Sequence, residues 1–167
     1  DKHFSRRKEL YGSGHEGARF YLFNVAALKL VSLLKFKADV LHCHDWQTGL
    51  VPYLKNTRFK KSRTLANAAT VFTIHNLVFQ LGSNWWEIPT KYINFAKRAI
   101  LSADAINTVS ETYAQEILKR SFGQDLHRVL INREHKLFGV VNGIDYKDLN
   151  PKNDKTIYRN YDHKKIQ

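Results

Sequence analysis

Two histidines, an aspartate and a tryptophan lie within five positions of one another, at His42, His44, Asp45 and Trp46. Imidazole and carboxylate groups form hydrogen bonds and transfer protons, and an indole face packs against apolar surfaces. Three interpretations fit these residues. The histidines hydrogen-bond to loop carbonyls at the end of a strand, or His42 and His44 share a metal ion from one strand face. In the third, His44 and Asp45 hydrogen-bond to a sugar or phosphosugar, with Trp46 as a wall.

The elements expected around this cluster would place it at the edge of a sheet. Residues 40–41 are apolar and suit a buried parallel strand, while Gly49 and the apolar residues after it suit the start of a helix. Ligands of open α/β sheets gather at the carboxyl ends of the strands. Because such polar side chains are costly to bury, we expect the cluster to meet a ligand or its own members.

A second polar pair follows the next expected strand. Residues 70–74 are β-branched or aromatic and lead directly into His75 and Asn76. A pair that only caps its own loop would explain these two side chains. Polar residues at the ends of two successive parallel strands favour a shared cleft instead.

The remaining pattern alternates helices with strands. Residues 103–109 and 137–141 read as strands, and Ser110 suits the N-cap of a helix over 111–120. Residues 20–34 have the spacing of a helix with one buried face. That face is expected to consist of Phe20, Phe23, Ala27, Leu30, Val31 and Leu34. This alternation predicts an α/β fold, a Rossmann-like parallel sheet with helices on both faces.

Composition limits the classes of protein. The 167 residues are 43% hydrophobic and 13% aromatic, which is typical of one globular domain. No apolar run approaches the roughly 20 residues that span a bilayer, and no signal peptide is visible. A single cysteine excludes an internal disulfide and suits the cytoplasm. The formal charge of +12 comes from scattered residues without an aromatic stacking pattern, so we expect neither nucleic acid nor a membrane as partner.

Four motifs in order carry a resemblance to a known family. They are HCHDWQTGLVPYLK at 42–55, FTIHNL at 72–77, ADAINTVSETYA at 103–114 and GVVNGID at 139–145. Together they resemble the bacterial glycogen synthases and plant starch synthases. These are retaining glucosyltransferases of the GT-B architecture, in which two Rossmann-like domains face a cleft.

The resemblance implies an activity and roles for the residues. The activity would be transfer of glucose from ADP-glucose or UDP-glucose to the non-reducing end of an α-1,4-glucan, with retention and without a metal or other cofactor. His44 would hydrogen-bond to the donor sugar near the reacting carbon, and Asp45 would orient the loop. His75 and Asn76 would line the acceptor side. Ser110 would begin a helix whose N-terminus faces the cleft.

The resemblance also implies a domain organisation. Residues 1–150 match part of the N-terminal domain, and 151–167 match the start of the segment that crosses to a C-terminal nucleotide-sugar domain. No Arg-x-x-x-Gln-Lys-Gly or Glu-Pro-x-Gly segment of that second domain is present. We therefore expect the chain to be inactive alone and to need that domain as its partner. A plant protein of this kind would lie in the plastid.

Two stretches depart from the family pattern. His15 and Glu16 stand where the family has Asp and Asn, and the segment after Gln80 is shorter than usual. Trp85 and Trp86 in that segment offer either a sugar-stacking surface or a loop anchor. Two other functions remain open at this point: a non-catalytic glucan-binding remnant, and a metal-dependent hydrolase that uses His42 and His44.

Overall fold

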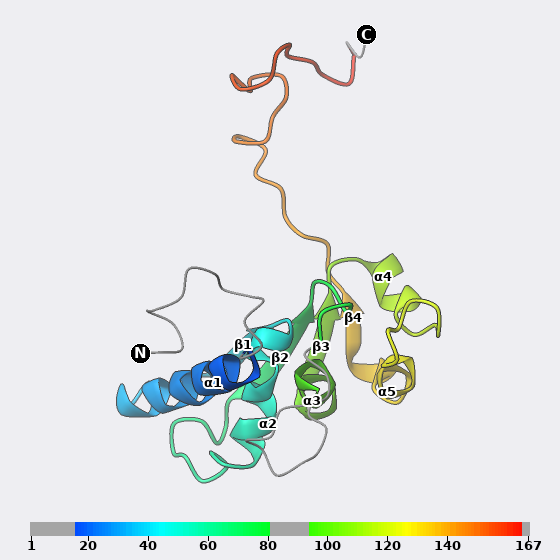
Figure 1. The fold of residues 1–167 in the computed structure, drawn as a ribbon. Coiled ribbons are helices and arrows are strands. Elements are labelled where there is room, and N and C mark those ends of the chain that lie inside the picture. Colours follow the sequence, from blue (N-terminus) through cyan, green and yellow to red (C-terminus); the bar gives the residue numbers. More distant parts are fainter. Residues whose placement is uncertain (1–15, 81–93, 165–167) are drawn as a thin grey trace.

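The computed structural model describes residues 16–80 and 94–164 (Figure 1). The departure at His15 and the expectations for Trp85 and Trp86 lie outside the described residues. The helices are α1 (Glu16–Leu33), α2 (Leu50–Asn56), α3 (Phe95–Ser102), α4 (Glu111–Glu116) and α5 (His127–Ile131), with 3₁₀ turns η1 (Trp46–Thr48) and η2 (Glu134–Lys136). The strands are β1 (Val40–His44), β2 (Ala69–Ile74), β3 (Ala105–Thr108) and β4 (Leu137–Gly139).

The four strands form one parallel sheet in the order β1-β2-β3-β4. This confirms the predicted α/β fold with parallel strands. In the register, His44 pairs with Thr73 and Thr73 pairs with Asn107. Strand β4 is shorter than the expected 137–141, although the amide of Val140 still donates to the carbonyl of Thr108 at 2.8 Å.

One face of the sheet carries the core. Because the strands follow in sequence order and crossovers are right-handed, the connecting helices fall on the same side. Cys43, Phe72 and Ile106 point to that side and are buried, whereas Val40 and Phe138 on the other face are exposed. The expected helical layer on the second face is not seen in the part of the chain that the structure describes.

Helix α1 buries a face that only partly matches the expected one. Phe20 of the expected set is buried and Val31 packs against the core, but the buried Val25 and Leu28 lie outside that set. Leu34, just past the end of the helix, is 69% exposed. Phe23 and Leu30 of the predicted face are exposed as well. The helix lies against α2 and η1, where the buried Asn24 donates through Nδ2 to the carbonyl of Gln47 at 2.7 Å. This hydrogen bond stabilises the contact between α1 and η1, because a buried amide N–H needs an acceptor.

Helix α4 begins as expected and ends early. The Ser110 hydroxyl accepts from the amide of Tyr113 at 2.9 Å, which confirms the predicted N-cap. The helix stops at Glu116, short of the expected residue 120. A Cβ at Gly139 would lie 2.3 Å from Cα of Glu111, so this close approach of β4 to α4 requires glycine.

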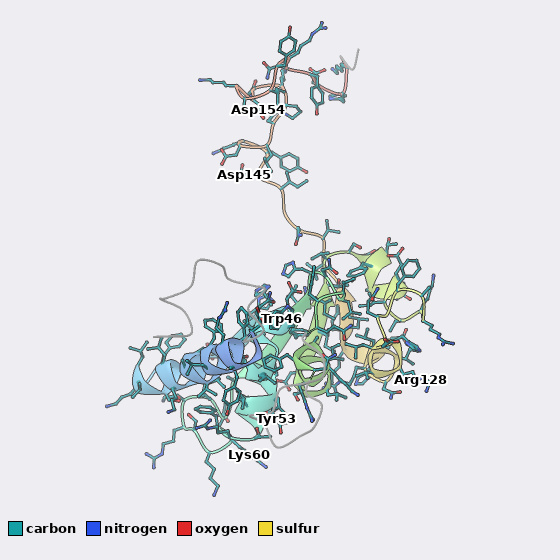
Figure 2. The ribbon with its side chains drawn as sticks, in the orientation of Figure 1. Trp46, Tyr53, Lys60, Arg128, Asp145 and Asp154 are labelled. Atoms are coloured by element: carbon teal, nitrogen blue, oxygen red, sulfur yellow. The ribbon has the colours of Figure 1, made fainter. Side chains whose placement is uncertain are left out.

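Residues 140–164 contain turns but neither helix nor strand. Asp145 and Asp154 mark this segment as it extends away from the sheet and its helices (Figure 2). Within the described ranges, no helix has the length and apolar character that crossing a membrane requires.

Candidate functional site

The loop after β1 is held by its own side chains. The Thr48 hydroxyl accepts from the amide of His44 at 2.6 Å and donates to the carbonyl of the same residue at 2.7 Å. Asp45 adopts φ 52° and ψ −175°, a conformation that non-glycine residues rarely take. Thr48 therefore clamps the backbone of His44, and surrounding contacts maintain a strained residue directly after it.

The Asp45 carboxylate joins the ends of β1 and β2. Its Oδ1 accepts from the amide of His75 at 2.8 Å and from the amide of Asn76 at 3.4 Å. The amide of Asp45 in turn donates to the carbonyl of Thr73 at 2.9 Å. Because these bonds link two loops through backbone groups, Asp45 fixes their relative position.

Three imidazole rings lie in a row at this edge. The rings of His42 and His44 are 4.2 Å apart between centroids, and those of His44 and His75 are 5.3 Å apart. Nδ1 of His44 and Nε2 of His75 form a hydrogen bond of 3.0 Å. The structure therefore brings together the histidines of both polar motifs, and all three side chains are exposed at the edge.

The neighbours of His44 favour its neutral form. Partial desolvation lowers the pKa of His44, and the nearby His42 and His75 lower it further, while the Asp45 carboxylate opposes this shift. At neutral pH the ring therefore carries one N–H donor and one lone pair, without a positive charge.

Trp46 is not the exposed wall expected from the sequence. Its side chain is only 6% exposed and packs edge-on against Phe20, with ring centroids 4.8 Å apart. Phe95 lies on another side at 6.3 Å. The 3₁₀ turn after Asp45 directs the indole into the core, where it supports the loop from beneath.

The remaining expected site residues have local partners. Oδ1 of Asn76 accepts from the amide of Val78 at 3.0 Å, forming a turn in its own loop. The Ser110 hydroxyl serves as the N-cap described above. Tyr113 connects helix α4 to the loop after β2, because its hydroxyl accepts from the amide of Leu77 at 3.1 Å.

Sequence reasoning did not single out Thr48, Thr73, Asn107 or Tyr113, which hold the loops and rings in place. The hydroxyl of Thr73 lies 2.7 Å from Nε2 of His42 and donates to Oδ1 of Asn107 at 2.6 Å. The sequence held only a weak signal for Thr73 and Asn107, because the register of the strands is needed to see that they lie on the same sheet face as His42.

A metal centre is not supported by the geometry. Among residues 16–80 and 94–164, no group of three or more His, Cys, Asp or Glu side chains is arranged to hold a metal ion. Nε2 of His42 is bonded to Thr73, and Nδ1 of His44 is bonded to His75. Cys43 points into the core, and burial raises the pKa of its thiol to about 12.

Comparisons with known proteins agree on one family. The family model of the starch synthase catalytic domain matches residues 1–132. The chain is 37% identical to glycogen synthase of Clostridium perfringens, over 98% of the chain and 38% of that protein. It is 40% identical to glycogen synthase 2 of Geobacter sulfurreducens, over 96% of the chain and 38% of that protein.

A solved structure shares the fold. The catalytic domain of starch synthase IV from Arabidopsis thaliana, bound to ADP and acarbose, superposes with a TM-score of 0.81. It is 30% identical to the chain and is matched over 96% of the chain and 36% of that structure. The chain thus spans less than two fifths of the length of these relatives. With most of its residues matched by the family model, the chain belongs to the starch synthase catalytic domain family of glycosyltransferases.

Proposed function

We propose that this chain acts within a longer glycogen or starch synthase that transfers glucose from ADP-glucose or UDP-glucose to the non-reducing end of an α-1,4-glucan, with retention. The observation that carries this proposal is the row of His42, His44 and His75 at the carboxyl edge of a parallel sheet, where such folds bind ligands. The ADP and acarbose bound to the Arabidopsis relative support a nucleotide-sugar donor and a glucan acceptor.

His44 is the proposed contact to the donor sugar. Its exposed ring is held by His75 through Nδ1, so Nε2 remains the nitrogen to meet a sugar hydroxyl. Glycosyl transfer passes through a transition state with positive charge on the sugar ring. A neutral imidazole tolerates that charge, whereas an imidazolium would repel it, so the lowered pKa of His44 suits this role.

Further residues are proposed to bind or orient. Asp45 holds the two loops together, and His75 and Asn76 line the acceptor side beside His44. Ser110 begins the helix that borders the site. The net charge of +12 would steer an anionic nucleotide sugar toward the protein.

The proposed organisation has two domains. Residues 1–150 would belong to the acceptor-side domain and 151–167 would lead to a C-terminal domain that binds the nucleotide sugar. Catalysis depends on holding both reactants in one geometry, so neither domain acts alone. The cytoplasm is the proposed compartment.

The test is a transfer assay on the full-length protein. Purified protein is incubated with glycogen and either ADP-glucose or UDP-glucose, and incorporation into the polymer is measured. We expect incorporation from one of the donors, release of the new glucose by an enzyme specific for α-1,4 ends, and none from the 167-residue chain. Glycogen binding without incorporation from either donor would contradict the proposal and identify a glucan-binding protein.

A further inference from the structure

A continuous line of hydrogen bonds runs across three strands behind the imidazole row. It begins at Asn107 on β3, passes through Thr73 on β2 and ends at His42 on β1. The Thr73 hydroxyl donates to Oδ1 of Asn107 at 2.6 Å and lies 2.7 Å from Nε2 of His42. Thr73 is only 3% exposed, so water does not readily replace either bond.

The single proton of the Thr73 hydroxyl determines the tautomer of His42. A threonine hydroxyl carries one proton, and that proton is given to Asn107. The oxygen of Thr73 can then only accept from the imidazole, so Nε2 of His42 must carry a hydrogen. A neutral His42 is consequently held as the Nε2–H tautomer, with its lone pair on Nδ1.

The ring held in this way lies directly against His44. The two ring centroids are 4.2 Å apart with the planes inclined by 34°, and the ring of His75 lies 5.3 Å from that of His44. Since His42 is exposed, packing against a core does not fix its ring. The hydrogen bond to Thr73 therefore determines which way the ring faces.

We propose that Thr73 and Asn107 are positioning residues for His44, which act through the orientation and tautomer of His42. The two residues touch no substrate in this role. The inference rests on the proposed function for its kinetic consequence, while its structural consequence for His42 is independent of any activity.

Two substitutions at position 73 separate the hydroxyl from the shape of the side chain. Thr73→Val keeps the branched shape and removes the hydroxyl, whereas Thr73→Ser keeps the hydroxyl. Thr70→Val is the matched control, because Thr70 is a buried threonine of the same strand whose hydroxyl bonds to Asp104 at the opposite edge. Asn107→Leu is the second variant, which leaves Thr73 in place but removes the acceptor of its proton.

The first measurement is the tautomer of His42 by long-range 1H–15N correlation spectra in mildly alkaline buffer. We expect Nε2–H in the wild-type protein, in Thr73→Ser and in Thr70→Val. In Thr73→Val the two tautomers should mix. In Asn107→Leu the freed Thr73 proton can turn to Nε2, so the Nδ1–H form should gain. An unchanged tautomer in both folded variants, Thr73→Val and Asn107→Leu, would overturn the proposal.

The second measurement is the steady-state kinetics of the full-length protein. Loss of an outer partner of a functional histidine costs about 10-fold to 100-fold in activity in metal sites, and we expect about 10-fold in kcat for Thr73→Val with little change in donor KM. Thr73→Ser should restore kcat, and Thr70→Val should lower stability alone. An equal fall of kcat in Thr70→Val would show a merely structural role. If the wild-type protein transfers no glucose, the proposed function fails, and the tautomer measurement still decides the inference.

Discussion

The two edges of the sheet share one pattern of hydrogen bonds but differ in what surrounds it. At each edge an aspartate next to a neighbouring strand accepts hydrogen bonds from one end of β2. Asp45 follows β1 and accepts from the amides of His75 and Asn76 at the carboxyl edge. Asp104 precedes β3 and accepts at Oδ2 from the amide and the hydroxyl of Thr70, each at 2.8 Å, at the amino edge.

The surroundings of the two aspartates differ. The amide of Asp104 returns a bond to the Thr70 hydroxyl at 3.1 Å, so a buried threonine is fully bonded there. Lys55 and Lys136 contribute favourable charge to Asp104. Asp45 instead has a positive φ and stands beside exposed imidazoles. The bonds at the amino edge therefore stabilise the fold. At the carboxyl edge, a strained backbone residue lies beside exposed side chains, a combination that is typical of functional sites.

The largest expected effect is on activity at the carboxyl edge. His44→Ala should lower kcat of the full-length enzyme by about 10²–10³, the cost of losing a transition-state hydrogen bond, while the protein remains folded. The matched control is His135→Ala, an exposed histidine before β4 at the other edge, which should keep its kcat. Steady-state kinetics and thermal melts would measure both. Near-normal kcat in a folded His44→Ala enzyme would remove His44 from the site.

The next effect is on stability at the amino edge. Asp104→Ala removes the acceptor of two bonds from the buried Thr70 and should lower the free energy of unfolding by about 1–2 kcal/mol. Urea denaturation would measure this, and kcat of the full-length enzyme should change little. A loss of activity without a loss of stability would reverse the contrast between the edges.

The difference in stability between the wild-type protein and Asp104→Ala should depend on pH in a definite direction. Burial acts to raise the pKa of Asp104, but the bonds from Thr70 and the charges of Lys55 and Lys136 outweigh it and lower the pKa. A carboxylate with a lowered pKa stabilises the fold above its ordinary pKa, and this contribution disappears as the pH falls through the lowered value. The stability gap between wild type and Asp104→Ala should therefore be full at neutral pH and shrink in acid.

A smaller effect separates strain from hydrogen bonding at Asp45. Both Asp45→Ala and Asp45→Gly lose the carboxylate, but only glycine adopts φ 52° and ψ −175° without strain. We expect the glycine variant to be more stable than the alanine variant by about 1 kcal/mol in urea unfolding. The reverse order would show that the backbone at Asp45 is unstrained.

The smallest effect is on the titration of His44. Asp45→Asn removes the one nearby charge that raises the pKa of His44, so this pKa should fall further, whereas His75→Gln should raise it. Proton NMR of the ring of His44 as a function of pH would follow both variants. A rise of the pKa in Asp45→Asn would mean that the carboxylate does not raise the pKa of His44, and a fall in His75→Gln would mean that the neighbouring imidazole does not lower it.

Local patterns in the sequence were enough to predict strand β2, the start of helix α4 and the carboxyl edge of the sheet as the place of the polar residues. The β-branched run at 70–74 corresponds to β2, and Ser110 caps α4 as its position before a helical pattern predicts. Polar residues directly after β1 and β2 fall at the carboxyl edge in any parallel sheet. These features depend on neighbours in the chain, so a single sequence contains them.

Tertiary structure alone decided what the side chains meet. His44 and His75 are 31 positions apart, and the register of β1 on β2 with the Asp45 link brings their rings together. The sequence predicted Trp46 as a wall of a sugar site, yet the turn after a positive φ directs its side chain into the core. Helix α1 has apolar residues around much of its circumference, so packing against α2 and η1 chose the buried face. Burial and long-range hydrogen bonds are properties of the packed chain, because periodicity fixes where a residue points along its own element and not what lies opposite.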